Sequence, residues 1–222
     1  MHFARIAFLI PTLTLATLVA AAPSDLPISG EVIDGQRQIA LPAEGPAPDL
    51  HIYRGDYVNF LPEGDRTMRL QIADLSIDES LPKRGEKSYV KFKEAGEYDY
   101  LLDGRAGWIT VHELAHSNYR EMRAREAREL IETVHPLILD VRTAREFSQG
   151  HVEGAKLLPI RELQHRVEEI SAHRDEPIFI YCRSGNRSTV AARILMDRGF
   201  ERIYNLRYGI VEWTREGLPL VH

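Results

Sequence analysis

The sequence predicts two domains, an all-β Greek-key sandwich followed by an α/β domain with a parallel sheet. Between about residues 28 and 113, short alternating runs are separated by Gly, Pro and Asp, which is typical of an antiparallel sandwich. After about residue 114, uninterrupted apolar runs alternate with helical patterns, which indicates a parallel sheet covered on both faces. We expect the domains to span 24–113 and 136–222, with a linker and first helix at 114–135.

The first residues have the pattern of a secretory signal peptide. Arg5 gives a positive start, Ile6 to Val19 are mostly apolar, and Ala20 to Ala22 offer a small-residue cleavage region. The apolar run is short for a membrane span of about 20 residues, which favours removal over anchoring. We predict that residues 1–21 are cleaved, that the mature chain is exported to the periplasm, and that it is not held at a membrane.

The composition and net charge of the chain limit the kinds of molecule that it is expected to bind. Hydrophobic residues make up 44% and charged residues 27% of the chain, as in ordinary globular proteins. The formal net charge of −5 offers no basic footprint for nucleic acid. We therefore expect small molecules or proteins as partners, and not nucleic acid.

Six alternating runs are the candidate strands of the first domain. They cover residues 51–54, 57–61, 68–72, 89–92, 98–102 and 108–111. Turn candidates between them are residues 54–56, 63–65, 83–85 and 95–97.

The second domain begins with a helical pattern. Apolar residues at three- and four-residue spacings predict an amphipathic helix over 117–134, and Pro136 ends it. Strands are then expected at 137–141, 155–158, 178–182 and 202–206, with helices at 161–172 and 188–198 between them.

Cys182 is the one cysteine of the chain, so it cannot form an intramolecular disulfide. It follows an apolar strand pattern and precedes a helix, and ligands of α/β sheets bind at this end of a strand. The amide N–H groups of a tight loop before a helix attract anions, and thiolate is the nucleophilic form of cysteine. We predict that Cys182 is a nucleophile, with substrate contacts from Arg183, Ser184, Gly185, Asn186, Arg187 and Ser188.

These residues resemble the rhodanese family, and further motifs extend the resemblance over about 115–222. Three segments of this chain resemble the opening signature of that family: Leu139-Asp140-Val141-Arg142, Glu146-Phe147 and Gly150-His151-Val152-Glu153-Gly154-Ala155. Its closing signature, in which Gly-Gly is more usual, resembles Tyr208-Gly209-Ile210-Val211-Glu212-Trp213, and its tail resembles Gly217-Leu218-Pro219-Leu220. The resemblance implies a single rhodanese domain.

Loop length separates the chemistries of this family. Its sulfurtransferases have a six-residue loop, whereas its phosphatases have one more residue before the arginine. Cys182 to Arg187 is Cys-x4-Arg, and Ser188 stands where a phosphatase would have arginine. The spacing favours sulfur transfer, with a rhodanese-fold phosphatase as a remote alternative.

The resemblance implies a double displacement without a cofactor or metal. Cys182 takes sulfur from thiosulfate or a similar anionic donor as a persulfide, and a thiophile such as cyanide or a thiol removes it. Asp140 and Arg142 either line the pocket or form a structural ion pair, and His151 is expected to be structural. A sulfur-carrier protein that delivers sulfur to a dedicated partner stays open as the alternative.

Two further patterns concern metals. His112-Glu113-Leu114-Ala115-His116 matches the zinc-protease motif HExxH, but it follows a predicted strand directly, which disfavours the required helix. Residues 53–58, 95–100 and 107–111 resemble a cupredoxin, although a blue-copper site needs a Cys that this domain lacks. Copper binding by His51 with other side chains stays open, and we expect the first domain to dock a protein partner or restrict the substrate.

Overall fold

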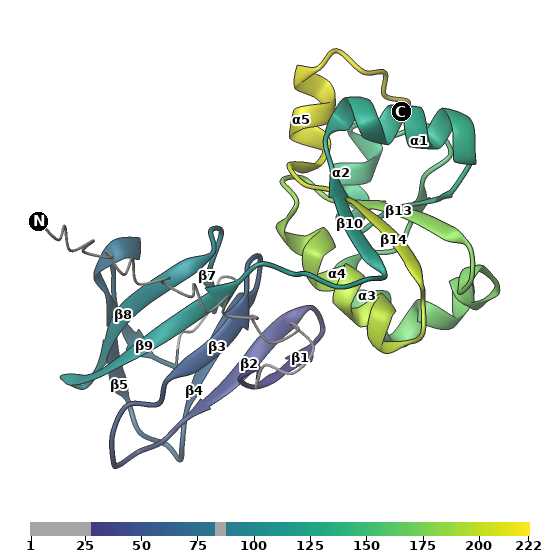
Figure 1. The fold of residues 1–222 in the computed structure, drawn as a ribbon. Coiled ribbons are helices and arrows are strands. Elements are labelled where there is room, and N and C mark those ends of the chain that lie inside the picture. The colour runs from purple at the N-terminus through teal and green to yellow at the C-terminus, as the bar shows by residue number, and fades with distance from the viewer. Residues whose placement is uncertain (1–27, 83–87) are drawn as a thin grey trace, which may run out of the picture.

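A computed structural model describes residues 28–82 and 88–222, and it contains two domains joined near residues 113–118 (Figure 1). The predicted signal peptide at 1–21 and the turn candidate at 83–85 lie outside the described residues. No helix within the described ranges is long and apolar enough to span a membrane.

The first domain is rich in sheet. Its strands are β1 (Glu31–Ile33), β2 (Gln36–Leu41), β3 (Leu50–Tyr53), β4 (Tyr57–Pro62), β5 (Met68–Ile72), β6 (Ile77–Leu81), β7 (Val90–Lys91), β8 (Gly96–Leu102) and β9 (Arg105–His112), with a 3₁₀ turn, η2 (Ala73–Leu75). One sheet has the order β1-β2-β4-β7 and the other β3-β9-β8-β5-β6. Alternate residues of both sheets, such as Phe60 and Leu102, meet in one buried cluster, so the sheets form a sandwich.

The prediction of an antiparallel sandwich was partly wrong. β2 pairs with β4 in parallel, and β3 pairs with β9 in parallel, while β5, β6, β8 and β9 are joined by antiparallel pairings. Alternation marks which side chains face the core but carries no information on the direction of the neighbouring strand. β1, β2 and β6 were not predicted.

The second domain is an α/β domain, as predicted. It comprises β10 (Tyr119–Met122), α1 (Ala124–Val134), β11 (Leu137–Asp140), α2 (Ala144–Ser148), β12 (Lys156–Leu157), α3 (Ile160–Arg166), the 3₁₀ helix η3 (Val167–His173), β13 (Pro177–Tyr181), α4 (Asn186–Asp197), β14 (Arg202–Leu206) and α5 (Gly209–Arg215). Its parallel sheet has the order β10-β14-β13-β11-β12.

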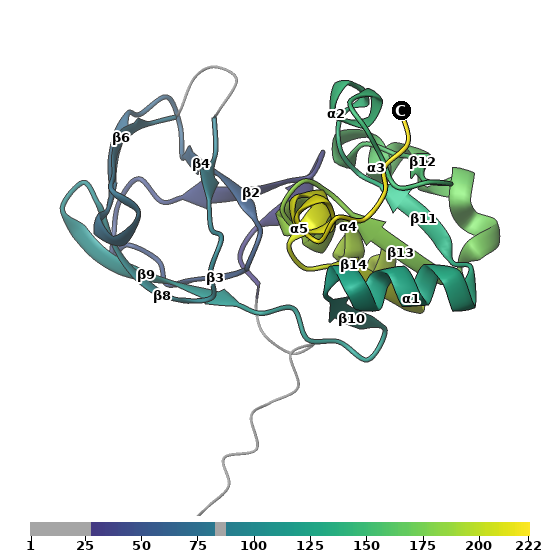
Figure 2. The same cartoon turned by 90° about the horizontal axis from the view of Figure 1, so that it is seen from above.

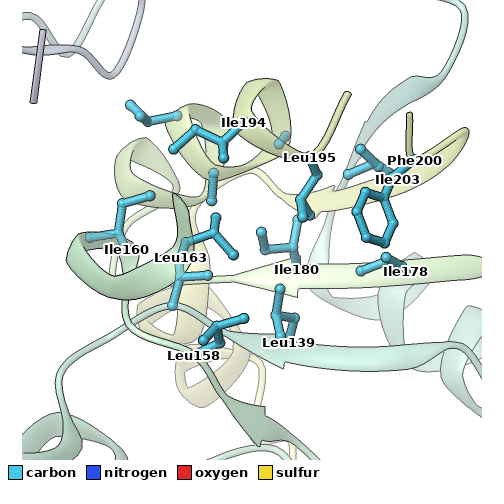
Figure 3. Close-up of a cluster of buried hydrophobic side chains, with 14 of the residues drawn as sticks. Leu139, Leu158, Ile160, Leu163, Ile178, Ile180, Ile194, Leu195, Phe200 and Ile203 are labelled. Atoms are coloured by element: carbon cyan, nitrogen blue, oxygen red, sulfur yellow. The ribbon is translucent and has the colours of Figure 1, made fainter. Parts of the chain in front are cut away.

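Helices cover both faces of this sheet. α3 and α4 pack on one face, where Leu163, Leu195 and Ile180 lie in the same buried cluster (Figure 3). α1 and α5 cover the other face, where Trp213 packs with Phe179. Residues of β13 therefore alternate between two cores, which explains why the strand is an uninterrupted apolar run.

Two elements differ from the sequence prediction. The amphipathic helix expected over 117–134 begins only at Ala124, because residues 119–122 pair in parallel with β14 as the edge strand β10. Tyr119 and Met122 are buried in the sheet, and their spacing fits a helix face equally well. The helix expected over 161–172 ends at Arg166 and continues as η3. Helices α2 and α5 were not predicted.

Ion pairs join the two domains, and the one between Asp56 and Arg193 is buried. Asp56, which is 1% exposed, accepts hydrogen bonds from Arg37 Nε and from Arg193 Nη2 of α4, both at 2.6 Å. Arg54 pairs with Glu113 at 2.7 Å and with Glu121 of β10. The turn between β3 and β4 is thereby fixed against the α/β domain. Seen from above, α4 and α5 lie on the side of that domain nearest the sandwich (Figure 2).

Candidate active site

Cys182 directly follows β13 at the carboxyl end of the parallel sheet. Strand alternation places it on the same side as Ile178 and Ile180, and its side chain is 1% exposed. Ser188 Oγ lies 3.6 Å from Cys182 Sγ, at the distance of a weak hydrogen bond to sulfur. The thiol therefore lies at the floor of the loop that residues 182–188 form, here called the cysteine loop.

Two glycines allow the cysteine loop to pack tightly. Gly185 has φ +92°, and a Cβ atom added there would lie 1.7 Å from the carbonyl oxygen of Arg207. Gly209, with φ +61°, would place a Cβ atom 2.5 Å from the carbonyl oxygen of Cys182. Only glycine fits either position without moving backbone. Tyr208, at the position where Gly-Gly is more usual, has φ −108° and needs no glycine.

The carbonyl groups of three cysteine-loop residues accept hydrogen bonds, whereas the N–H groups of residues 183–188 find no acceptor among the described residues. The N–H of Ile210 donates to the Cys182 carbonyl at 2.8 Å, and Val211 donates to the Arg183 carbonyl at 3.2 Å. The Gly185 carbonyl accepts from Thr189 N and from Ser188 Oγ. Within the described residues, the amide N–H groups of residues 183–188 donate to no protein acceptor. This pattern suits an anion at the loop.

The side chain of Arg187 is held by a carboxylate. Both Nη atoms of Arg187 donate to Glu146 at 2.7 Å, and Thr143 holds Glu146 through its own backbone N–H and hydroxyl. The hydrogen bonds from Arg187 lower the pKa of Glu146 to about 2 despite partial burial. Burial lowers the pKa of Arg187, but the Glu146 contacts outweigh it and raise that pKa. The sequence indicated Arg187 but assigned no role to Glu146.

The other predicted loop residues differ in position. Arg183 and Ser184 are exposed, whereas Asn186 and Ser188 are buried. Asn186 Nδ2 has no hydrogen-bond partner among the described residues. Gly185 precedes the first residue of α4 as its N-cap. The structure thus brings all the predicted loop residues to one turn, with only part of the set open to solvent.

Asp140 and Arg142 form a buried ion pair. Arg142 Nε and Nη2 contact Asp140 Oδ2 at 2.9 and 2.6 Å, and Nη2 also donates to the Gly150 carbonyl at 2.8 Å. Burial lowers the pKa of Arg142, but the Asp140 hydrogen bonds outweigh it and raise that pKa. Arg142 thus forms a structural ion pair with Asp140 and also lines a cavity between the domains. His151 stacks on Phe147, with ring centroids 3.7 Å apart.

A cavity of about 890 Å³ lies between the domains beside the cysteine loop. Arg142, Thr143 and Arg187 line it from the α/β domain, and Tyr57 and Tyr89 line it from the sandwich. The sequence did not point to either tyrosine, because each lies on a strand pattern typical of any sandwich.

Electrostatic contacts also link the sandwich to the cysteine. Burial raises the pKa of the Tyr57 phenol, and the negative charge of Cys182 raises it further. Burial lowers the pKa of the Lys91 ammonium, and Cys182 opposes that change. Tyr57 and Lys91 are thus within electrostatic range of Cys182.

The zinc-protease motif has no helix. His112 ends strand β9, as the sequence predicted, and Glu113 pairs with Arg54 and Arg207. His116 lies in the connection that follows, where its Nδ1 accepts from Asn118 N at 3.1 Å. His112 Nε2 instead contacts His51 Nδ1 at 3.0 Å. The described residues contain no cluster of three or more His, Cys, Asp or Glu side chains suited to a metal.

Comparisons with known proteins place the cysteine loop in a family. Residues 123–216 match the model of the rhodanese-like domain. A sulfurtransferase from Allochromatium vinosum is 43% identical over 95 residues, which cover 43% of this chain and 87% of that protein. A putative sulfur carrier protein, YrkF of Bacillus subtilis, is 36% identical over 77 residues, or 35% of this chain and 40% of that protein.

Among solved structures, a rhodanese-related protein from Thermoplasma volcanium aligns with a TM-score of 0.42 and 31% identity. The alignment covers 46% of this chain and 98% of that one. The identity to the Allochromatium vinosum protein extends over most of that relative's length, and the family model includes the whole cysteine loop. The chain belongs to the rhodanese-like family.

Proposed function

We propose that the protein is a sulfurtransferase that carries sulfur as a persulfide on Cys182. The observation that carries this proposal is the set of amide N–H groups at residues 183–188, which donate to no described residue around a buried cysteine. An anion held there is stabilised by several backbone donors at once. A persulfide anion on Cys182 is such a group, and it needs no metal or cofactor.

The reaction is a double displacement. The Cys182 thiolate attacks the outer sulfur of thiosulfate, a new S–S bond forms, and the bond to the sulfonate sulfur breaks. Sulfite leaves with the electron pair of that bond, and Cys182 holds the persulfide. Cyanide then attacks the outer sulfur, thiocyanate forms, and the thiolate is regenerated. Both steps are nucleophilic displacements at sulfur, and no external oxidant or reductant is consumed.

Two features support the division of roles. Arg187 is neutralised by Glu146, so it braces the loop and contributes hydrogen bonds more than free charge. Arg183 is exposed, and none of the described carboxylates pairs with it. Arg183 is therefore the loop arginine best placed to attract an anionic donor.

A sulfur carrier is the second candidate. The chain has one cysteine, so the persulfide must pass to an external acceptor, and a Bacillus subtilis relative is named as a putative sulfur carrier protein. Turnover with cyanide separates the two candidates. A carrier accepts one sulfur per Cys182 but transfers it slowly to a small thiophile.

Thiocyanate formation from thiosulfate and cyanide tests the enzyme. The wild type should turn over many times, and Cys182→Ala should be inactive because no other thiol exists. Arg183→Ala should weaken donor binding while the protein stays folded, because Arg183 is exposed and has no carboxylate partner among the described residues. Turnover retained in Cys182→Ala would contradict the proposal. Hydrolysis of a phosphate monoester in place of sulfur transfer would favour the phosphatase alternative.

We also propose that residues 1–21 direct export to the periplasm and are removed after Ala21. Sequencing the N-terminus of the protein recovered from the periplasm tests this, with Ala22 expected as the first residue. A retained Met1 would contradict it.

The sandwich is proposed to be a cupredoxin-like domain that does not carry a blue-copper site. Its two packed sheets are compatible with the cupredoxin resemblance, and it contains no cysteine. A copper titration should give no intense blue-copper absorption band.

A further inference from the structure

The sandwich is fixed directly over the cysteine loop. Gly55, in the turn between β3 and β4, packs so closely that an added Cβ atom would lie 2.9 Å from the carbonyl oxygen of Asn186. The next residue, Asp56, pairs with Arg193 two turns further along α4. A turn held at both points gives the following strand, β4, a defined position beside the loop.

Three side chains of the sandwich form one surface near the loop, here called the β4–β7 wall. Tyr57 and Lys91 are direct cross-strand partners, so they share a face of their sheet. The Lys91 ammonium lies 5.1 Å from the centroid of the Tyr57 ring, and Tyr89 packs edge-on to that ring at 4.8 Å. Tyr57 and Tyr89 line the cavity that Arg187 also lines. The wall therefore faces the side of the cysteine loop that carries Arg187.

The arginines that line the cavity differ in one respect from Lys91 of the β4–β7 wall, which lies beside the lining residue Tyr57. Glu146 binds Arg187 and Asp140 binds Arg142. Lys91 is half-buried, and it forms no ion pair with a carboxylate in the part of the chain that the structure describes. Burial lowers its pKa, the Cys182 charge raises it, and Lys93, Arg187 and Arg183 lower it again. Lys91 is a cation within electrostatic range of other cations and of Cys182, an arrangement that an incoming anion would stabilise.

We propose that Lys91, positioned by Tyr57, is part of the donor site and that the sandwich thereby selects small anionic sulfur donors. This inference rests on the sulfur-transfer function proposed above. Lys91 attracts the oxyanion end of the donor, while the outer sulfur faces Cys182. Tyr57 is a positioning residue, since its ring holds the ammonium. The β4–β7 wall is then a component of the active site, in place of a separate docking module.

Lys91→Gln tests the charge, and Lys93→Gln is its matched control, because Lys93 is two residues away and exposed. Lys91→Gln should raise the KM for thiosulfate about fivefold with little change in kcat, as expected for one charge across a partly hydrated gap. Lys93→Gln should leave KM within about twofold, because charges at an exposed position are screened. Lys91→Arg should restore most of the affinity. Equal effects of the two glutamine variants would overturn the inference.

Alkylation of Cys182 provides a readout that needs no sulfur transfer. Iodoacetate is anionic and iodoacetamide is neutral. The ratio of the iodoacetate rate to the iodoacetamide rate therefore reports the electrostatic potential at the thiol. Lys91→Gln should lower that ratio about fivefold, whereas Lys93→Gln should leave it unchanged. The Cys182→Ala protein gives the background rate of alkylation at side chains other than Cys182.

The two readouts separate the inference from the function on which it rests. In one outcome, Lys91→Gln lowers the alkylation ratio, Lys93→Gln does not, and the wild type transfers no sulfur from thiosulfate. The anion site is then supported, and the proposed function is wrong. If the wild type transfers sulfur and neither lysine affects KM or the ratio, the function stands and the inference is wrong. If the wild-type thiol reacts with neither reagent, the wall closes the site and the inference is also wrong.

Discussion

The cysteine loop and the β4–β7 wall face each other but are built in different ways. The loop consists of consecutive residues 182–188, shaped by Gly185 and closed by the N–H groups of α5. The wall combines Tyr57 with Tyr89 and Lys91, which lie far from Cys182 in the sequence and reach it only through domain packing. The surroundings of Cys182 within the loop are therefore formed locally, whereas its outer surroundings depend on the interface between the domains.

The charged side chains of the two regions also have different kinds of partner. In the loop, Arg187 has a carboxylate partner that fixes its position. In the wall, Lys91 contacts an aromatic ring instead. A paired arginine braces a structure, and an unpaired lysine attracts ligands, so variants of the two should differ in whether stability or donor affinity changes.

Gly209→Ala, on the loop side, should give the largest loss of turnover. The added Cβ atom would meet the backbone of Cys182 and Arg183 at about 2.5 Å, so the loop must shift. A displacement of that kind in a catalytic loop costs on the order of a hundredfold in rate. Thiosulfate:cyanide turnover at saturating donor measures it.

Gly199→Ala is the matched control for this prediction. Gly199 has φ +83°, similar to Gly209, but an added Cβ atom there would meet nothing within 4 Å. Both variants bear the strain of a left-handed backbone, and only Gly209→Ala should lose activity. A similar loss in both would show that backbone strain, and not contact with the loop, is responsible.

Asp56→Asn should have the largest effect on stability, through the interface that positions the wall. Asp56 lies between Arg37 and Arg193, and all three side chains are buried. Removing the one carboxylate leaves two buried cations uncompensated, which costs about 3–5 kcal/mol in comparable cases. Urea denaturation measures the free energy of unfolding.

Asp78→Asn serves as its control, because Asp78 pairs with Arg69 at the surface. That variant should unfold like the wild type, since exposed pairs contribute little. If both variants unfold alike, the buried triad does not hold the domains together.

Glu146→Gln should have the smallest of these effects and should depend on pH. The Glu146 pKa is lowered from 4.5 to about 2, so the ion pair with Arg187 stabilises the fold above pH 4.5. That stabilisation, about 1–2 kcal/mol, should decrease as the pH falls from 4.5 towards 2. The measurement is the difference in free energy of unfolding between wild type and variant across this range.

A difference that grows on acidification would contradict the pairing, because protonated Glu146 and Gln are both neutral. Glu153→Gln serves as the reference variant, because Glu153 is exposed and pairs with none of the described cations. It should unfold like the wild type throughout the range.

Features formed by neighbouring residues were predictable from the sequence. The apolar run before Cys182, the glycine at 185 and the following helix are consecutive, and the structure joins them as strand β13, loop and α4. The parallel sheet of the α/β domain was predicted for the same reason.

Features that depend on contacts between residues far apart in the sequence could not be predicted from the sequence. The strand β10 exists because it pairs with β14, and its apolar spacing alone fits a helix. The parallel pairings of β2 with β4 and β3 with β9 have no local signal. Lys91 and Tyr57 look like ordinary strand residues until the buried pair of Asp56 with Arg193 brings their domain onto α4. Glu146 lay within a recognised signature, and only its contact with Arg187 gives it a role.

The most direct test of sulfur transfer is the intact mass of the protein after incubation with thiosulfate. The wild type should gain the mass of one sulfur atom, peptide mapping should locate that atom at Cys182, and cyanide should remove it with release of thiocyanate. Cys182→Ala should gain nothing. A wild-type protein whose mass stays unchanged, or a sulfur atom found on the Cys182→Ala variant, would show that Cys182 does not carry sulfur.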